Sequence, residues 1–367
     1  MLSAELYPPE RLVAAQRATA GIGLDALLIT PGSDLRYLTG YDAHAQERLT
    51  CLVLPARGEP TLVVPTLERP AAEVATSGLR IVDHRDGDDP YPLVVEALDR
   101  PPTVVALGDR MWAAQVLALR AALPGTEQRL AGDVLAELRI RKSPAEVEAL
   151  RAAGAAIDAV HDRMGEWLLP GRTERQVGVD IAEAILAAGH ATVDFVIVAS
   201  GPNGASPHHD TADRVIRAGE PVVVDIGGTM PSGYCSDSTR TYVVGPAPAD
   251  VVDFYAVLRA AQRAAVDAVR PGVTCAQVDA AARDLITAAG YGPAFLHRTG
   301  HGIGLDGHEE PYIVAGNELP LEPGMAFSIE PGIYLAGHAG ARIEDIVVCA
   351  DGGADVLNTT TTELAEL

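Results

Sequence analysis

The sequence predicts an α+β protein with two domains, a smaller α/β domain over residues 1–133 and a larger domain over residues 134–367. In the first part, short apolar runs alternate with helical patterns, as is typical of α/β domains. In the second part, the order helix, helix, hairpin occurs twice. A length of 367 residues with 48% apolar residues excludes a disordered chain and is sufficient for two buried cores.

The first domain is predicted from its pattern of turn residues and apolar runs. The turn at residues 57–59 lies between two apolar runs and predicts a hairpin. The expected helices cover residues 10–19 and 112–122, and the expected strands cover residues 26–30, 51–54, 61–64, 81–82 and 103–107.

The pattern changes at about residue 134, where we place the domain boundary. Ser143 precedes Pro144 and Glu146, which is a strong helix start because serine caps a helix and proline fits its first position. The apolar spacing that follows continues to about residue 169. We therefore expect a linker helix over residues 134–141 that extends to about residue 150.

The second domain contains a coarse internal repeat. Each copy has two helices separated by a Pro-Gly pair, followed by strands that form a hairpin. This repetition predicts two halves related by a pseudo-two-fold axis, with a site between them. The first copy is expected to have helices near 144–168 and 173–188 and strands near 193–199, 221–227 and 236–244. The second copy is expected to have helices near 250–269 and 274–289 and strands near 325–330 and 341–349.

The composition excludes several classes of function. The chain has 28 basic and 50 acidic side chains, a formal charge of −22, so a nucleic-acid-binding face is not expected. Lys142 is the only lysine, and its neighbours match neither a phosphate-binding loop nor a Schiff-base site. The four cysteines form no C-x-x-C pair. No signal peptide or membrane-spanning run is evident, so we expect a soluble cytoplasmic protein.

The two predicted hairpins carry two carboxylates each. A first hairpin centred on residue 231 places Asp225 opposite Asp237. A second hairpin centred on residue 337 places Glu330 opposite Glu344. Facing carboxylates repel each other, and both ionise readily only around a cation. The alternative for each acid, a solvated strand end with an Asx turn, accounts less well for two such pairs.

Histidines gather in loop-like sequence near the hairpins. His297, His301 and His308 fall within twelve positions among glycines, and His208 lies in an earlier loop. This clustering favours a functional site over solvent-exposed structure. The run at residues 302–307 matches G-x-G-x-x-G but opens no helix, so we do not expect a dinucleotide site.

The predicted ligand set indicates the chemistry. Four carboxylates and one imidazole favour hard, oxygen-preferring divalent ions such as Mn²⁺, with Co²⁺ or Zn²⁺ as alternatives. Carboxylates can also bridge two such ions about 3.5–4 Å apart, which activate a water between them. The residues therefore predict a metal-assisted hydrolase.

Five segments together resemble the pita-bread metallopeptidases, and among them the Xaa-Pro peptidases, prolidase and aminopeptidase P. The segments are Val-Asp225-Ile-Gly, Tyr-Cys-Ser-Asp237-Ser-Thr-Arg-Thr, Gly-His301-Gly-Ile-Gly-Leu, Ile-Glu330-Pro-Gly-Ile-Tyr and Arg342-Ile-Glu344-Asp. Residues 27–41 and 138–146 are also similar to that family, so the resemblance covers nearly the whole chain. It implies a pita-bread catalytic domain with a pseudo-two-fold repeat, preceded by a creatinase-like N-terminal domain.

The resemblance also implies roles for individual residues. The implied metal ligands are Asp225, Asp237, His301, Glu330 and Glu344, with Asp237 and Glu344 bridging two ions. The implied catalytic and substrate-cleft residues are Glu330, His308, His208 and His297, supported by Tyr334 and Arg342. His209 has no counterpart, and we expect it to be exposed or behind the site.

The implied reaction is the hydrolysis of the Xaa-Pro bond, above all in dipeptides, by a hydroxide that bridges two divalent metals. Glu330 is then the general base, and His308 stabilises the oxyanion. Either His208 or His297 positions the scissile end of the substrate. Small proline-containing peptides are the expected partners, and the resemblance further implies a homodimer.

Several alternatives stay open at this point. Aminopeptidase P, which releases the N-terminal residue from longer Xaa-Pro peptides, is the main one, although the length of the chain favours the dipeptidase. The intact ligand set argues against a creatinase-type enzyme and against a binding module on an inactive scaffold, and residues 1–133 argue against a methionine aminopeptidase. A dipeptide carboxylate should need an arginine, for which Arg298 and Arg48 are candidates.

Overall fold

The computed structural model describes residues 5–76 and 78–367, and the chain separates into two compact units, Met1–Arg139 and Ile140–Leu367. The expected boundary at residue 133 lies inside helix α7 (Gly132–Arg139). Val134 and Leu135 of this helix are buried, and α7 packs against α2 (Glu10–Gly21). The helix therefore belongs to the first unit, and the division falls after it.

Two helices, not one, occupy the range expected for a linker helix. After α7 ends, Arg141 forms a β-bridge and Lys142 donates a backbone hydrogen bond of 2.7 Å, both to residues 324–325 of the second unit. These extended contacts interrupt the helix. Ser143 then caps α8 (Pro144–His161) in the manner expected from the sequence, with a capping box.

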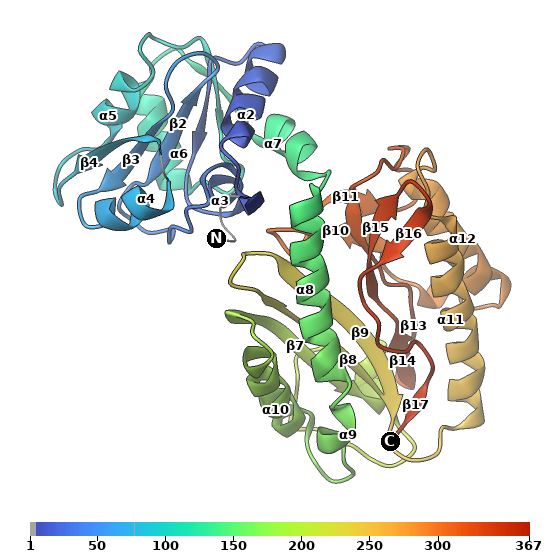
Figure 1. Ribbon diagram of the computed structural model, residues 1–367. Coiled ribbons are helices and arrows are strands. Elements are labelled where there is room, and N and C mark those ends of the chain that lie inside the picture. Colours follow the sequence, from blue (N-terminus) through green and yellow to red (C-terminus); the bar gives the residue numbers. More distant parts are fainter. Residues whose placement is uncertain (1–4, 77) are drawn as a thin grey trace. The chain divides into compact units, whose positions relative to one another are not determined.

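The first unit contains a mixed sheet covered by helices (Figure 1). In its described residues the strand order is β4-β3-β2-β1-β5-β6, with β1 antiparallel to β2 and parallel to β5. The predicted strands and helices are all present, with ends displaced by at most two residues. The strands are β1 (Ala26–Ile29), β2 (Cys51–Pro55), β3 (Thr61–Pro65), β4 (Arg80–His84), β5 (Val104–Leu107) and β6 (Glu127–Leu130). The other helices are α3 (Ser33–Thr39), α4 (Arg69–Ala75), α5 (Tyr91–Glu96) and α6 (Ala113–Ala122).

The first half of the second unit packs helices against a sheet with the strand order β17-β9-β8-β7. Helix α8 contacts β9, and α10 contacts β7. The helix expected to continue to residue 169 ends at His161, because the chain turns there and places Met164 and Trp167 in the core. The further elements are α9 (Met164–Trp167), α10 (Glu174–Ala187), β7 (Thr192–Ser200), the 3-10 helix η1 (Gly201–Ala205), β8 (Pro221–Thr229), β9 (Cys235–Val243) and β17 (Ala365–Glu366).

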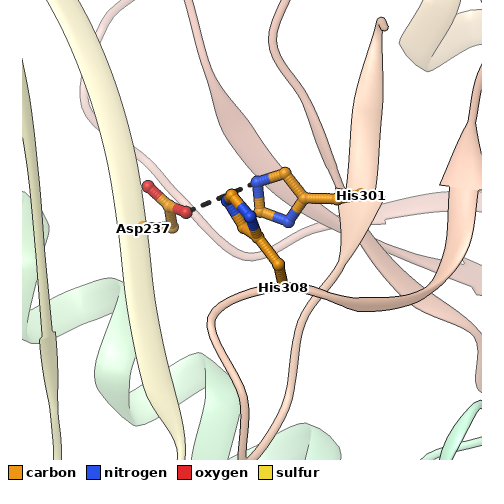
Figure 2. Close-up of side chains that lie close together, drawn as sticks. All are labelled: Asp237, His301 and His308. Atoms are coloured by element: carbon orange, nitrogen blue, oxygen red, sulfur yellow. Dashed lines mark ion pairs between the residues drawn. The ribbon is translucent and has the colours of Figure 1, made fainter. Parts of the chain in front are cut away.

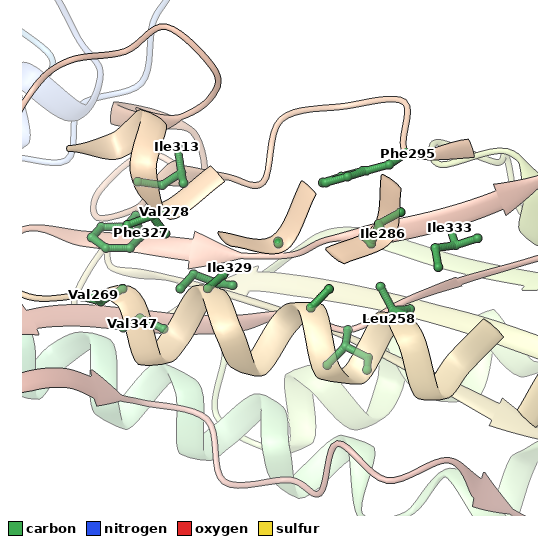
Figure 3. Close-up of a cluster of buried hydrophobic side chains, with 14 of the residues drawn as sticks. Leu258, Val269, Val278, Ile286, Phe295, Ile313, Phe327, Ile329, Ile333 and Val347 are labelled. Carbon is green, nitrogen blue, oxygen red and sulfur yellow. The ribbon is translucent and has the colours of Figure 1, made fainter. Parts of the chain in front are cut away.

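The second half repeats this arrangement, which confirms the predicted internal repeat. Its sheet has the strand order β11-β10-β12-β15-β16, and β13 and β14 form a separate hairpin. Figure 3 shows Leu258, Val278 and Phe327 in the apolar cluster between its helices and strands. The elements are α11 (Ala249–Ala268), α12 (Cys275–Ala288), the 3-10 helix η2 (Gly292–Ala294), β10 (Gly300–Gly302), β11 (Glu309–Ile313), β12 (Ala326–Ile329), β13 (Gly332–Leu335), β14 (Ala339–Arg342), β15 (Asp345–Ala350) and β16 (Gly353–Val356). Among the described residues, no helix has the length and apolar content needed to cross a membrane.

The same local interactions begin the second helix of each half. Thr173 and Gln176 form a capping box at α10, and Thr274 and Gln277 form the equivalent box at α12. The glycines of the preceding Pro-Gly pairs have φ angles of 89° and 87°, which glycine adopts without strain. The two halves therefore repeat in their hydrogen bonding as well as in element order.

The two halves of the second unit meet along β9. The Glu344 amide donates to the Thr239 carbonyl at 3.0 Å, and the Thr241 hydroxyl donates to the Arg342 carbonyl at 3.0 Å. These bonds hold the segment between β14 and β15 against the middle of β9. Polar side chains from both halves consequently converge at this junction.

We expect Phe327→Ala to lower the free energy of unfolding of the second unit by about 3–5 kcal/mol, because this ring is fully buried in the core. Urea denaturation can be followed in a Trp112→Phe background, in which Trp167 of the second unit is the only remaining tryptophan. Leu296→Ala is the control, since Leu296 is exposed, and it should cost less than about 0.5 kcal/mol. Equal losses for the two variants would contradict the packing described here.

Candidate active site

Six side chains with metal-ligating atoms form one continuous cluster at the junction. Within each of three overlapping groups, the ligand atoms lie within 4.8 Å of one another. The groups are Asp225–Asp237–Glu344, His301–Glu330–Glu344 and Asp237–His301–His308. The cluster thus brings together the five residues predicted as ligands and adds His308. Figure 2 shows the rings of His301 and His308 beside each other, facing Asp237 on β9.

The two acids of the first hairpin are diagonal neighbours, whereas the sequence predicted that they lie directly opposite. Asp225 pairs with Thr239, two positions beyond Asp237, so the β8–β9 hairpin is centred on residue 232. The turn spans the five residues 230–234, with Gly233 at a φ of 88°. This length moves the centre of the hairpin by one residue and therefore the partner of Asp225 by two. Residues two apart on a strand share a face, so the two carboxylates still converge.

The second hairpin has the predicted register. The pairs of β12 with β15 and of β13 with β14 are all centred on residue 337. Glu330 and Glu344 lie between these two paired stretches. The Ser328 hydroxyl donates to Glu330 Oε1 at 3.2 Å, and the Thr239 hydroxyl donates to Glu344 Oε2 at 2.6 Å. Each carboxylate is therefore oriented by a hydroxyl group.

Burial and mutual repulsion oppose the ionisation of part of this cluster. Burial, followed by the charges of neighbouring carboxylates, raises the pKa of Asp237 and of Glu344 well above the usual values. Burial also acts to raise the pKa of Glu330, but the hydrogen bond and charge of His301 prevail and lower it to about 2. A bound cation would favour the ionised form of all these groups, because it replaces repulsion by attraction.

Two observations fit a cation at this place. Asp225 Oδ2 accepts a hydrogen bond from Arg342, whereas Asp225 Oδ1 is buried and has no hydrogen-bond partner in the described part of the chain. An unpaired buried carboxylate oxygen is costly unless a further group binds it. His301 Nδ1 lies 3.1 Å from the Gly302 carbonyl, so this nitrogen carries hydrogen, and Nε2 faces the carboxylates. A hydrogen bond of this kind commonly fixes the tautomer of metal-binding histidines.

Arg342 connects the acids with the histidines through a chain of hydrogen bonds. It donates to the Thr239 hydroxyl at 3.0 Å and to the Tyr334 hydroxyl at 2.9 Å. The Tyr334 oxygen lies 2.8 Å from His297 Nε2, and His297 Nδ1 lies 2.7 Å from the Arg298 carbonyl. Because a carbonyl can only accept, Nδ1 is the donor and Tyr334 donates to Nε2. Both ring nitrogens of His297 are therefore engaged.

The other predicted histidines differ in their surroundings. His308 lies against His301 with ring centroids 3.8 Å apart, and burial, together with the positive charge of His301, lowers the pKa of His308 to about 4. His208 is exposed and has no hydrogen bond or ion pair among the described residues. His209, expected to be exposed or behind the site, is partly buried, and its Nε2 lies 2.9 Å from a carboxylate oxygen of Glu174.

The predicted residues line a cavity of about 550 Å³, a volume suited to a small molecule. Its polar lining comes from Asp225, Asp237, His301, Glu330, Glu344, His208, His297, His308, Arg298 and Arg342, and its apolar lining from Phe195, Ile197 and Pro207. Tyr334 is buried behind this wall, where it bonds Arg342. The arrangement can bind cations and a small polar ligand side by side.

Sequence reasoning missed two residues that orient the acids. Thr239 accepts a hydrogen bond from Arg342 and donates one to Glu344, and Ser328 donates to Glu330. Thr239 lies two positions after Asp237 on β9, and Ser328 lies two positions before Glu330, which directly follows β12. The alternation of a strand could therefore have identified both, since residues two apart lie on the same face.

The two arginines considered for a substrate carboxylate differ in location. Arg298 lines the cavity, and its guanidinium carbon lies 4.4 Å from the centre of the Tyr312 ring. Arg48 belongs to the first unit and pairs with Asp86 at 2.6 Å. Arg298 therefore stays the candidate within this site.

The only lysine has a structural position. Lys142 Nζ lies 2.7 Å from Glu309 Oε1, and the two side chains are 1% and 9% exposed. Since Glu309 follows His308 in the chain, this ion pair attaches the His308 loop to the start of α8. Lys142 is not among the residues that line the cavity.

Comparison with known families gives the class of the protein. Residues 148–351 match metallopeptidase family M24, and residues 11–141 match the creatinase/prolidase N-terminal domain. The chain belongs to metallopeptidase family M24. It is an enzyme of the metallopeptidase class, and its fold, a creatinase-like N-terminal domain followed by a pita-bread catalytic domain, is the one that the sequence predicted. Membership of this family implies divalent metal ions.

Individual relatives are similar over nearly their whole length. The chain is 57% identical to a probable dipeptidase PepE of Mycobacterium tuberculosis, over 98% of this chain and 96% of that protein. It is 36% identical to an Xaa-Pro dipeptidase of Lactobacillus delbrueckii, over 94% and 95% of the two chains. The crystal structure of dipeptidase PepE from Mycobacterium ulcerans matches with a TM-score of 0.91 and 59% identity, over 97% and 96%.

We expect Asp237→Asn to raise the Tm of the EDTA-treated protein by about 2–4 °C, because it removes one of several repelling buried charges. We also expect Mn²⁺ to raise the Tm of the unaltered protein, and the same change should abolish that increase if Asp237 is a ligand. Differential scanning fluorimetry with EDTA and with Mn²⁺ measures both effects. Asp253→Asn, at an exposed acid, should change neither. A full Mn²⁺ response in Asp237→Asn would count against Asp237 as a ligand.

Proposed function

We propose that this metallopeptidase hydrolyses the Xaa-Pro bond of dipeptides with two divalent metal ions. The observation that carries the proposal is the position of the ligand cluster, which opens into one cavity together with His208, His297 and Arg342. Relatives that are 57% and 36% identical to this chain are named probable dipeptidase and Xaa-Pro dipeptidase, which supports the same substrate class.

The proposed metal ligands are Asp225, Asp237, His301, Glu330 and Glu344. Asp237, Glu344 and His301 each contribute to two of the three ligand groups, and of these only the two carboxylates, with two acceptor oxygens each, would be able to hold two ions. This donor set favours Mn²⁺, with Co²⁺ or Zn²⁺ as alternatives. When bound, such ions supply an acidified water and polarise the scissile carbonyl.

Glu330 is the proposed general base. Its carboxylate belongs to the ligand cluster and lines the cavity, from where it can accept a proton from the attacking water. The Ser328 hydroxyl and the His301 ring hold one of its oxygens in place. Glu330 then passes the proton to the proline nitrogen, which leaves as an amine.

The histidines take separate parts in this proposal. His308 is neutral at pH 7, since its pKa is lowered to about 4, and it donates an N–H to the oxygen that becomes negative in the transition state. His208 is better placed than His297 to orient the scissile end, because both nitrogens of His297 are engaged. His297 instead offers its ring, held by Tyr334, as part of the wall.

The proposed preference for proline follows from the groups that the site can recognise. The nitrogen of an Xaa-Pro bond carries no hydrogen, so proline must be recognised by the shape of its ring. The apolar lining of Phe195, Ile197 and Pro207 provides surfaces of this kind beside the polar cluster. Small proline-containing peptides are therefore the proposed partners of the site. The homodimer and the cytoplasmic location stay predictions.

The substrate class can be tested with three peptides, Ala-Pro, Ala-Pro-Ala and Met-Ala-Ser, each assayed with metal-depleted and Mn²⁺-loaded protein. We expect Mn²⁺-dependent cleavage of Ala-Pro alone, because the proposed site takes a dipeptide. Release of alanine from Ala-Pro-Ala would indicate an aminopeptidase P instead. If none of the three peptides is cleaved in a metal-dependent manner, the proposal is wrong.

We expect Glu330→Gln to lower kcat for Ala-Pro by about 10²- to 10⁴-fold, since an amide cannot accept the proton. Steady-state kinetics at saturating Mn²⁺ measures this, and the metal content is determined in parallel because Glu330 is also a proposed ligand. Glu318→Gln changes an exposed acid of the same unit and should leave kcat unaltered. A kcat within two-fold of the unaltered enzyme would exclude Glu330 as the base.

A further inference from the structure

Two buried carboxylates outside the ligand cluster each attach a histidine-bearing segment of the cavity wall to a helix. One is Glu174, the first residue of α10, and the other is Asp279 on α12. Their side chains are 0% and 1% exposed. Neither has a part in the proposed reaction, and a buried carboxylate is costly unless it is fully hydrogen-bonded.

The Glu174 carboxylate binds donor groups along the whole segment 200–212. Its Oε1 accepts the amide and the hydroxyl of Ser200, both at 2.7 Å. Its Oε2 lies 2.9 Å from His209 Nε2 and 3.2 Å from the amide of Ala212. The side-chain amide of Asn203 reaches both oxygens, at 3.0 and 3.1 Å. One carboxylate thus ties the two ends and the middle of the segment to the start of α10.

This segment carries two residues of the cavity wall, Pro207 and His208. Among the residues that the structure describes, His208 itself has no hydrogen bond or ion pair that would orient it. Its neighbour His209 is bound to Glu174, and the carbonyl of Pro207 accepts a hydrogen bond of 3.2 Å from Arg342. The residues on both sides of His208 are therefore fixed, and this limits where its ring can lie.

In the second half of the unit, a buried carboxylate likewise attaches a segment of the cavity wall to a helix. Asp279 Oδ1 accepts both the amide and the hydroxyl of Thr299, at 3.2 and 2.7 Å, as Glu174 Oε1 does with those of Ser200. Asp279 also pairs with Arg283, whose Nη2 donates to the carbonyl of His297 at 2.8 Å. The segment from His297 to Thr299 is consequently held to α12.

We propose that Glu174 and Asp279 are positioning residues, and that each fixes one histidine-bearing wall of the cavity, that of His208 and that of His297. The kinetic part of this inference rests on the proposed function. A carboxylate is suited to the task because it accepts at both oxygens and brings no donor of its own. An amide of the same shape keeps one acceptor oxygen and adds an NH₂ group, which must then face other donors.

The attachment is tested without activity by hydrogen exchange of the full chain, followed by mass spectrometry. We expect Glu174→Gln to raise exchange over residues 200–212 and leave residues 297–301 unchanged, and Asp279→Asn to do the reverse. His209→Ala, which leaves the carboxylate intact but removes one of its donors, should raise exchange over residues 200–212 alone. Asp213→Asn is the control, because its exposed carboxylate pairs with exposed Arg175. Unchanged exchange, or an increase over the whole second unit, would overturn the inference.

Positioning is tested by a double-mutant cycle with His208→Ala, using kcat/KM for Ala-Pro. We expect Glu174→Gln to lower kcat/KM by about ten-fold or more when His208 is present, and by less than about two-fold in the His208→Ala background. An equal loss in both backgrounds would show that Glu174 acts only on stability and overturn the inference. If the unaltered enzyme does not cleave Ala-Pro, the proposed function fails, and the exchange experiment alone decides the attachment.

Discussion

Four carboxylates from two hairpins occupy one buried junction, and the geometry around them can be understood as a response to that concentration of negative charge. Arg342 bonds Asp225, and His301 lies beside Glu330 and Asp237, so positive groups offset part of the repulsion. The repulsion that is left, together with burial, raises the pKa of Asp237 and of Glu344. A protein that keeps such an arrangement needs cations to balance it, which links the stability of this unit directly to its chemistry.

The repeat explains how the acids reach the same place. Each half supplies two helices as a rigid support and one hairpin as a carrier of acids, and the halves join through β9 and the segment that contains Glu344. The second hairpin loses its ladder bonds where its acids lie, and there the amides of Glu330 and Glu344 donate to the carbonyls of Thr299 and Thr239 instead. Beyond the acids, a chain of hydrogen bonds runs from Arg342 through Tyr334 to His297 and so fixes part of the cavity wall as well.

Much of this could be predicted from sequence because the signals were local. The helix start at Ser143 and the hairpin centred on residue 337 depend on short stretches whose turn chemistry is clear. The first hairpin was misplaced by one residue because the length of its turn, with Gly233 at positive φ, is not fixed by the flanking strands. The break between α7 and α8 arises from pairing of residue 141 with Met325, a contact too distant in sequence to be read from either segment.

In the candidate site, too, local features could be predicted from the sequence and contacts between distant segments could not. Ligand types and their order along the chain were visible, whereas the role of Glu174 was not, since an acid in the first turn of a helix usually lies on the surface. Only the fold reveals that this acid faces Ser200 and His209. Residues that act by holding other residues depend on contacts between distant segments, and a single sequence carries little trace of them.

The burial of Lys142 against Glu309 has a consequence for covalent chemistry. Since this is the sole lysine, no lysine side chain is presented to acylating or aldehyde reagents in the folded state, and enzymes that acetylate or methylate lysine have no accessible target here. All other side-chain cations that are permanently charged are guanidinium groups, which keep their charge even in strongly alkaline solution. The arginine charges of the surface thus do not react with amine-directed reagents, and modification of the lysine would report that its ion pair with the His308 loop had opened.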